Sequence, residues 1–290
     1  MEMTAEDAGR QTEGARTWLG VSVAAADTAR ALVEMQRLAQ LADVIELRLD
    51  LMAHFDLARL LAARPCPVVV TYRPVREGGR FEGDEEARLA VLRQAAALGA
   101  EVIDIEWDSF KALGAVAPAR RMISRHFFTH MPADFGAQHA ALVASGAEIV
   151  KLVGMAQRLV DAAPVLDVLE RATVPTVAIA MGEYGLLTRI LAPRFFPGAW
   201  LTYAAAAEGQ AVAPGQIAIE VLRQRYQAHR LTSRTRVVGY WAQTAQDPPP
   251  AAAAEGDGVW VPCLCAPGEE RAAARAALGR WISFDEESAG

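Results

Sequence analysis

The stretch Val44-Ile45-Glu46-Leu47-Arg48-Leu49-Asp50 alternates apolar and charged residues. Side chains on a β-strand point to alternate faces, so Glu46, Arg48 and Asp50 are predicted to share one face. On a solvent-exposed strand this pattern would be ordinary. On a strand covered on both sides, the three charges must find partners. The stretch therefore predicts either a functional site or a structural ion-pair network at the carboxyl end of a buried strand.

Apolar runs of similar length recur along the chain and are separated by amphipathic, helix-like stretches, among them 27–41, 85–98, 137–145 and 157–171. The candidate strands are 19–23, 44–50, 68–73, 102–107, 122–126, 149–153, 176–181 and 200–203. Strands that alternate with helices indicate an α/β fold with a parallel sheet. Eight such units within 17–230 predict a closed (β/α)₈ TIM barrel. An open doubly wound sheet is the alternative, although no Gly-x-Gly-x-x-Gly follows the first strand.

The two ends of the chain differ from this pattern. Residues 1–16 are polar and partly acidic, which predicts a flexible N-terminus without the apolar core of a signal peptide. Residues 231–290 contain Asp247-Pro248-Pro249-Pro250 between short strand-like runs, followed by a helix-like run at 269–278. Proline-rich punctuation of this kind indicates a small C-terminal appendage to the barrel.

Composition excludes several classes of protein. The chain has 290 residues, 52% of them hydrophobic, which is enough for a folded core. Its net charge of −6 and the lack of a basic block argue against a nucleic-acid partner. No apolar run approaches the roughly 18 residues of a membrane helix, so no membrane association is expected. Three cysteines provide neither a disulfide framework nor a zinc-binding pattern, and a cytoplasmic protein without metal is expected.

Of the 29 basic residues, only Lys111 and Lys151 are lysine. Lys151 lies within Ile149-Val150-Lys151-Leu152-Val153, an otherwise apolar strand, whereas Lys111 is predicted to lie on the surface. Desolvating an ammonium is costly, and a buried amine is a nucleophile toward carbonyl compounds. Lys151 is therefore predicted either to form a Schiff base or to pair with one of the inward carboxylates.

Other residues that suit such chemistry end neighbouring strands. His126 ends the fifth candidate strand and could transfer protons near a Schiff base, although a lone histidine is more often structural. Arg189 follows the seventh strand and could hold a substrate carboxylate with its two-pronged donors. The small-residue loop 204–214 could act as a lid.

Taken together, these pieces resemble type I 3-dehydroquinate dehydratase, the Schiff-base enzyme of the shikimate pathway. The resemblance runs in order through 17–230. Its motifs are Val21-Ser22, Glu46-Leu47-Arg48-Leu49-Asp50, Tyr72-Arg73 with Arg76-Glu77-Gly78-Gly79, Ser124-Arg125-His126, Ile149-Val150-Lys151, Met181-Gly182-Glu183 with Thr188-Arg189, and Ala213-Pro214-Gly215-Gln216.

The resemblance implies a reaction that converts 3-dehydroquinate into 3-dehydroshikimate and water. Lys151 would form the Schiff base, His126 would move the proton and Glu77 would hold the imidazole. Substrate binding would fall to Ser22, Glu46, Arg48, Arg73, Arg189 and Gln216, with support from Asp50. The resemblance also implies a small-molecule partner only, no metal or organic cofactor, a cytoplasmic location and a possible homodimer.

The sequence departs from the family pattern at three positions. Val212 and Thr188 stand where serine is usual, and Phe127 stands where aspartate is usual, so Val212 is expected to remove one polar substrate contact. In the tail, 235–240 and 258–262 resemble an eroded start of shikimate dehydrogenase. The substrate-binding serines, catalytic positions and nucleotide loop of that enzyme are absent, so the tail is expected to be non-catalytic.

Two alternatives remain open. Another Schiff-base (β/α)₈ lyase or aldolase would need Lys151, but it would not predict His126, Glu77 and Arg189 together. A non-catalytic regulatory derivative of the barrel is suggested by Val212 and by the eroded tail.

Overall fold

Eight parallel strands form the centre of the computed structural model, which describes residues 16–250, 253, 258–266, 269 and 271–285. They are β1 (Trp18–Val23), β2 (Val44–Arg48), β3 (Val68–Thr71), β4 (Val102–Glu106), β5 (Arg120–Phe127), β6 (Ile149–Met155), β7 (Thr176–Met181) and β8 (Leu201–Ala204). Each strand pairs with its neighbours in chain order, and β8 pairs with β1. A parallel bridge between Thr176 and Ala199 joins the remaining edges. The predicted barrel is confirmed, and the open-sheet alternative is wrong.

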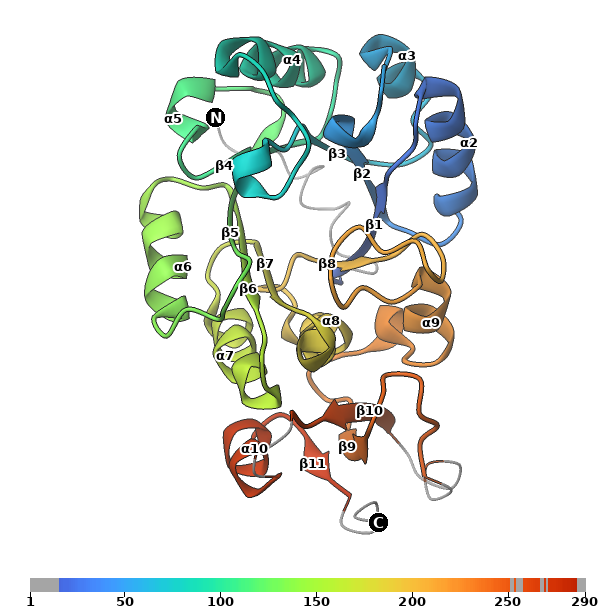
Figure 1. The fold of residues 1–290 in the computed structure, drawn as a ribbon, viewed down its shortest axis with the longest axis vertical. Coiled ribbons are helices and arrows are strands. Elements are labelled where there is room, and N and C mark those ends of the chain that lie inside the picture. The colour runs from blue at the N-terminus through green and yellow to red at the C-terminus, as the bar shows by residue number, and fades with distance from the viewer. Residues whose placement is uncertain (1–15, 251–252, 254–257, 267–268, 270, 286–290) are drawn as a thin grey trace, which may run out of the picture.

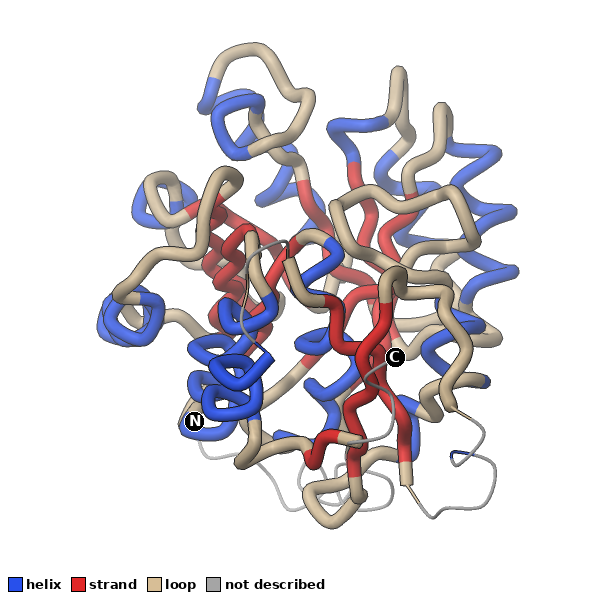
Figure 2. Tube along the Cα trace, turned by 60° about the horizontal axis from the view of Figure 1, so that its bottom comes forward, coloured by secondary structure: helices blue, strands red, loops and turns tan. Residues whose placement is uncertain are grey.

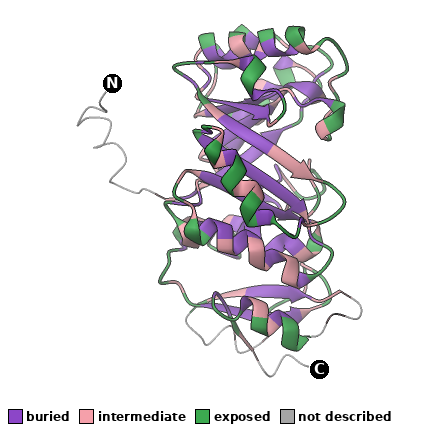
Figure 3. Cartoon of the chain, turned by 90° about the vertical axis from the view of Figure 1, so that its left-hand side faces the viewer, coloured by how far each residue is buried: buried purple, intermediate pink, exposed green. Residues whose placement is uncertain are grey.

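Helices cover the outside of the barrel (Figure 1). They are α2 (Thr28–Leu38), α3 (Leu57–Ala62), α4 (Glu85–Ala97), α5 (Phe110–Leu113), α6 (Phe135–Ala144), α7 (Ala163–Arg171), α8 (Leu186–Leu191) and α9 (Ile219–Gln224). Local sequence fixes where several begin, because Asp27, Asp56 and Asp84 accept a hydrogen bond from a first-turn N–H. In Figure 3 the strands are mostly buried and the outer faces of the helices are exposed.

The barrel interior is layered, and this layering positions the site. An apolar layer at the amino ends of the strands plugs the barrel; it contains Val44, Val69, Val102, Met122, Ile149, Val177 and Leu201. Two residues further along, the same inward faces carry polar side chains such as Glu46, Asp104, Ser124 and Lys151. Because side chains alternate along a strand, the charges gather above a dry floor at the carboxyl ends.

The structure corrects one detail of the strand prediction. The stretch 44–50 was expected to be one strand, but β2 ends at Arg48 and residues Leu49–Leu51 form a 3₁₀ turn, η1. Asp50 therefore leaves the inward row. Its carboxylate accepts hydrogen bonds from the backbone N–H groups of Arg73 and Arg80, both at 3.2 Å. The turn thus ties the mouths of β2 and β3 together.

The appendage is a separate parallel sheet in the order β10-β9-β11, made of β9 (Val237–Ala242), β10 (Val259–Leu264) and β11 (Ser283–Phe284), with α10 (Arg271–Leu278). Figure 1 shows its strands below those of the barrel, and Figure 2 turns this end of the molecule toward the viewer. Arg280 forms ion pairs with Asp167 and Glu170 on α7. Glu269 accepts hydrogen bonds from the N–H groups of residues 159 and 160, both at 2.9 Å, where the 3₁₀ turn η3 (Leu159–Ala162) begins.

At the other end, residues 1–15 lie outside the described part of the chain, and the prediction of a flexible N-terminus falls on them. Arg16 is described, and its guanidinium binds Asp43 through contacts of 2.6 and 2.7 Å. Within the described part, no helix is both long and apolar enough to span a membrane.

Candidate active site

One cavity of about 270 Å³ opens at the carboxyl ends of the barrel strands. All nine side chains predicted as catalytic or substrate-binding line it, namely Ser22, Glu46, Arg48, Arg73, Glu77, His126, Lys151, Arg189 and Gln216. They come from strands and loops spread over almost 200 positions of sequence. The barrel therefore brings every predicted site residue to one place, where this fold keeps its active sites.

Lys151 lies on β6 with only 6% of its surface exposed. Its Nζ donates hydrogen bonds to Asp104 Oδ2 at 2.8 Å and to Glu46 Oε1 at 3.1 Å, and lies 4.7 Å from the centre of the Tyr203 ring. The carboxylate pairing considered from the sequence is therefore present. Because the amine also faces the cavity, the pairing fixes its position and leaves it accessible to a substrate.

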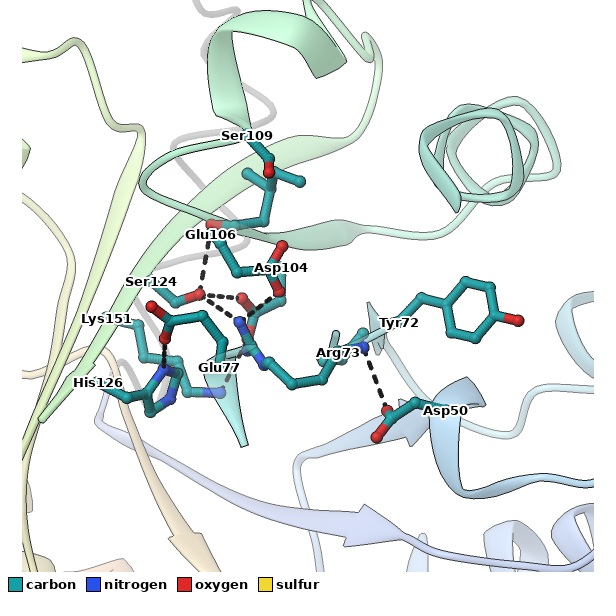
Figure 4. Close-up of polar contacts among 12 residues, drawn as sticks. Asp50, Tyr72, Arg73, Glu77, Asp104, Glu106, Ser109, Ser124, His126 and Lys151 are labelled. Carbon is teal, nitrogen blue, oxygen red and sulfur yellow. Dashed lines mark hydrogen bonds and ion pairs between the residues drawn. The ribbon is translucent and has the colours of Figure 1, made fainter. Parts of the chain in front are cut away.

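Asp104, on β4, connects Lys151 to a buried ion network (Figure 4). Arg73 Nη2 donates to Asp104 Oδ2 at 2.6 Å, and Arg73 Nη1 donates to Glu106 Oε1 and to Ser124 Oγ, both at 2.7 Å. Burial alone would raise the pKa of Asp104. The cations of Arg73 and Lys151 together have the larger, opposite effect, so the pKa lies well below its usual value. Asp104 is thus an anion that anchors Lys151.

Glu46, on β2, is the second anchor of Lys151. The hydroxyls of Ser22 and Thr71 donate to its two carboxylate oxygens. Burial raises the pKa of Glu46, but Lys151 and Arg48 more than offset it, and the net shift is downward. Ser22 and Glu46 therefore act as a unit, and both face the cavity.

Arg48 and Asp50 form a two-pronged ion pair, with contacts of 2.9 and 2.7 Å. Planar pairing of this kind fixes the orientation of a guanidinium. Asp50 thus holds Arg48 at the cavity rim without lining the cavity itself.

His126 and Glu77 form a second pair within the cavity. On β5, Ser124 lies opposite Lys151, and His126 is two residues further along the same face, one layer closer to the mouth. Glu77 comes from the 3₁₀ turn η2 (Val75–Glu77), and its Oε2 lies 3.0 Å from His126 Nδ1. An ionised Glu77 would accept the Nδ1–H and leave the Nε2 lone pair free.

Burial shifts the pKa of both members of this pair. It lowers the pKa of His126 well below the usual value, with help from the nearby cations of Arg73 and Lys151. It raises the pKa of Glu77 to about 7, and Arg73 offsets only part of that rise. At neutral pH the imidazole is therefore neutral and able to accept a proton.

Arg189, on α8, supplies a buried cation at the cavity wall. Its Nη1 and Nη2 donate to the carbonyls of Tyr203 and Pro214 at 3.3 and 3.1 Å, and burial lowers its pKa to about 10. Within the described part of the chain it forms no ion pair with a carboxylate. A buried guanidinium without a counter-charge is a natural site for a substrate anion.

The loop before α9 forms the remaining wall through Val212, Pro214 and Gln216. Gln216 Oε1 accepts the backbone N–H of Val212 at 2.9 Å, so this amide stiffens its own loop. Gly215 has φ +75°, and a Cβ on it would lie 2.2 Å from the carbonyl oxygen of Gly182. Only glycine fits there, which explains the close approach of this loop to β7.

Several site residues have no role predicted from the sequence, namely Asp104, Glu106, Ser124 and Tyr203. The alternating Asp104-Ile105-Glu106 repeats the pattern of β2 and was visible in the sequence, but nothing local indicated that Asp104 contacts Lys151. No group of three His, Cys, Asp or Glu side chains in the described residues is arranged to bind a metal ion.

The fold and the site together place the chain among (β/α)₈ barrel enzymes that hold a buried lysine between carboxylates at the barrel mouth. Within that class, the chain belongs to the type I 3-dehydroquinase family, whose sequence profile matches residues 19–233. This match covers nearly all of the predicted barrel domain.

Curated relatives agree with this membership. The chain is 36% identical over 210 residues to a bifunctional 3-dehydroquinate dehydratase/shikimate dehydrogenase of Arabidopsis thaliana, covering 68% of this chain but only 34% of the relative. It is 32% identical over 210 residues to a 3-dehydroquinate dehydratase of Methanopyrus kandleri, covering 68% of this chain and 94% of the relative. The chain thus spans about a third of the first protein and nearly all of the second.

Solved structures share the fold. A type I 3-dehydroquinate dehydratase of Clostridium difficile has a TM-score of 0.64 at 22% identity, over 74% of this chain and 93% of the other. A dehydroquinate dehydratase and shikimate dehydrogenase of S. pombe has a TM-score of 0.63 at 17% identity, over 96% of this chain and 58% of the other. The second likeness extends into the appendage.

Proposed function

We propose that the chain is a carbon–oxygen lyase that converts 3-dehydroquinate into 3-dehydroshikimate and water through a Schiff base on Lys151. The observation that carries this proposal is the position of Lys151 Nζ, which Glu46 and Asp104 hold at the cavity beside the His126–Glu77 pair. Membership of the type I 3-dehydroquinase family supports the same reaction.

In the first step, the unprotonated amine of Lys151 attacks the C3 ketone. The new C–N bond gives a carbinolamine, whose hydroxyl takes up a proton and leaves as water. The resulting iminium withdraws electrons from C2 and acidifies the proton there. Glu46 and Asp104 support this step by fixing Nζ, and both remain anionic next to the cation.

In the second step, His126 takes the proton from C2, and an enamine forms. The C1–O bond then breaks, and the hydroxyl leaves as water with the proton from His126. Glu77 holds the imidazole and stabilises the imidazolium that forms in between. Hydrolysis of the conjugated iminium by water releases 3-dehydroshikimate and returns the amine of Lys151.

Substrate binding would rest on Arg189, because its unpaired buried charge suits the substrate carboxylate. We propose that Ser22, Glu46 and Gln216 contact the hydroxyl and carboxylate groups. Arg48 and Arg73 would contribute their remaining N–H donors while keeping their ion pairs with Asp50 and Asp104. Val212 places an apolar side chain on the same wall.

The family resemblance supports further proposals: a cytoplasmic enzyme that forms a homodimer, uses no metal or organic cofactor and has a non-catalytic appendage at 231–290. In the appendage, α10 packs against η3, β10 packs against α8, and Arg280 pairs with carboxylates on α7. The residues that line the cavity all come from the barrel, which supports the last of these proposals. The mass of the full chain in solution would test the homodimer.

The proposed reaction is tested by mixing the protein with 3-dehydroquinate and following the ultraviolet absorbance of the conjugated enone in the product. The expected result is a rise that scales with protein concentration and is absent in Lys151→Ala. No rise at high protein concentration would exclude the dehydratase. That outcome would favour either another Schiff-base lyase or aldolase, or a regulatory derivative of the barrel.

A further inference from the structure

Phe128 is a large apolar residue that lines the cavity and leaves 41% of its surface accessible. Its ring stacks on the imidazole of His126, with ring centres 5.5 Å apart and planes within 11° of parallel. The His126 side chain is only 11% exposed. The phenyl ring is therefore an outer cover over the imidazole.

The same ring packs against the turn that carries Glu77. Gly78 follows Glu77 with φ +74°, and a Cβ on Gly78 would lie 2.6 Å from Phe128 Cζ. The position therefore needs glycine both for its backbone angle and for the space that the phenyl ring fills. Phe128 thus contacts both segments that supply the His126–Glu77 pair.

We propose that Phe128 is a positioning residue for the dehydration, and that its ring clamps the imidazole of His126 against Glu77 and keeps water from the pair. The kinetic part of this inference rests on the proposed function, whereas the clamping of His126 does not. Phe128 acts through His126, and no contact with the reacting atoms is assigned to it.

The charges around His126 determine what loss of the ring would do. Glu77 contacts it from η2. The charges of Arg73 after β3, Arg48 on β2, Asp104 on β4 and Lys151 on β6 act on it electrostatically. Burial is the largest cause of the low pKa of His126. Removing the phenyl ring lets water reach the imidazole, which favours its charged form. The pKa of His126 should then rise, and the rising limb of kcat/KM should move to higher pH.

Phe127 offers a matched control because strand alternation turns it to the other face of β5. Its ring lies 5.1 Å from the Arg125 guanidinium and 6.0 Å from the His130 ring. Phe127→Ala therefore removes the same volume one residue away without uncovering His126. Phe128→Tyr keeps the stacked ring. Phe128→Leu removes the ring but keeps an apolar side chain, and it takes the place of Phe128→Ala if that variant does not fold.

The test measures the pKa of His126 in the full chain by nuclear magnetic resonance of its imidazole C–H groups, identified by their loss in His126→Ala. We expect Phe128→Ala to raise this pKa by about one unit, a tenfold change in the protonation equilibrium. Phe128→Leu should give a smaller rise, while Phe128→Tyr and Phe127→Ala should leave the pKa unchanged. No rise in either Phe128→Ala or Phe128→Leu, or an equal rise in Phe127→Ala, would overturn the inference.

The pH profile of kcat/KM with 3-dehydroquinate supplies the second measurement. Phe128→Ala should move the rising limb by the same amount as the pKa of His126, and Phe128→Tyr should restore it. A shifted pKa with an unshifted profile would overturn the kinetic part. Because the resonance titration needs no substrate, an inactive wild type would contradict the proposed function while the clamping of His126 is still decided.

Discussion

Glu77 Oε2 and His126 Nδ1 lie 3.0 Å apart, although 49 residues separate them in the chain. One comes from a turn after β3 and the other from β5, and the order β5-β4-β3 in the sheet brings them to the same end of the barrel. Burial places Glu77 in surroundings that disfavour its charge, and its pKa rises from 4.5 to about 7. The ionised form that orients the imidazole is therefore held at a cost in stability.

This cost predicts a pH-dependent stabilisation by Glu77→Gln. Because folding raises the pKa of Glu77, the folded state favours its protonated form. The stability it contributes is full below pH 4.5 and is lost as pH rises through about 7. Urea unfolding should show Glu77→Gln gaining about 1–3 kcal/mol over wild type at pH 8 relative to pH 4.5. An equal difference at the two pH values would contradict the raised pKa.

His126→Ala should slow turnover of 3-dehydroquinate by roughly 10²–10⁴, the usual contribution of one acid–base group. The Schiff base should still form, because Lys151 and its carboxylate anchors are untouched. Steady-state kinetics gives the first quantity, and borohydride reduction in the presence of substrate gives the second. Normal turnover in His126→Ala would show that another group moves the proton.

Val212→Ser should lower the KM for 3-dehydroquinate about two- to tenfold, because a hydroxyl on the cavity wall adds one net hydrogen bond. Val212→Thr, which also keeps the branched shape, should have a similar effect. Steady-state kinetics on both variants checks this. If neither variant lowers the KM, Val212 does not mark a missing substrate contact.

Glu269→Ala should destabilise the fold without changing catalysis. Glu269 accepts the first free N–H groups of η3, and loss of such a cap costs about 1–2 kcal/mol. We expect a fall of a few degrees in Tm with kcat and KM unchanged. The control is Glu86→Ala, which removes a carboxylate that is 69% exposed on α4 together with its surface ion pair to Arg93. An exposed pair of this kind contributes little, so Tm should stay nearly unchanged. A changed KM in Glu269→Ala would mean that the appendage takes part in substrate binding.

Much of the fold could be predicted because its pattern is local. Alternation in β2 and the repeated strand–helix order are visible in the sequence, and they suffice for a barrel whose inward charges meet at one end. The predicted end of β2 was wrong because Leu49 and Asp50 continue the alternation of residue types, whereas the backbone turns after Arg48. Alternation of residue types does not report where a strand stops pairing.

The site was predictable only as far as local motifs reach. Lys151 stands out in its apolar strand, and the family motifs add the other predicted residues. The Lys151–Asp104 contact joins β6 to β4 across the barrel interior and depends on register and shear, which the sequence does not display. For the same reason the sequence does not indicate a role for Phe128, since its stacking on His126 depends on how a loop folds back over Gly78.

The Schiff base on Lys151 is tested most directly by borohydride reduction of the protein in the presence of 3-dehydroquinate, followed by mass spectrometry of its peptides. Reduction converts an imine into a stable secondary amine and so records which nitrogen attacked the ketone. The exposed Lys111 is the internal comparison, as the other lysine of the chain. We expect a single adduct on Lys151 and none in Lys151→Ala. An adduct on Lys111, or turnover by wild type with no adduct at all, would contradict this expectation.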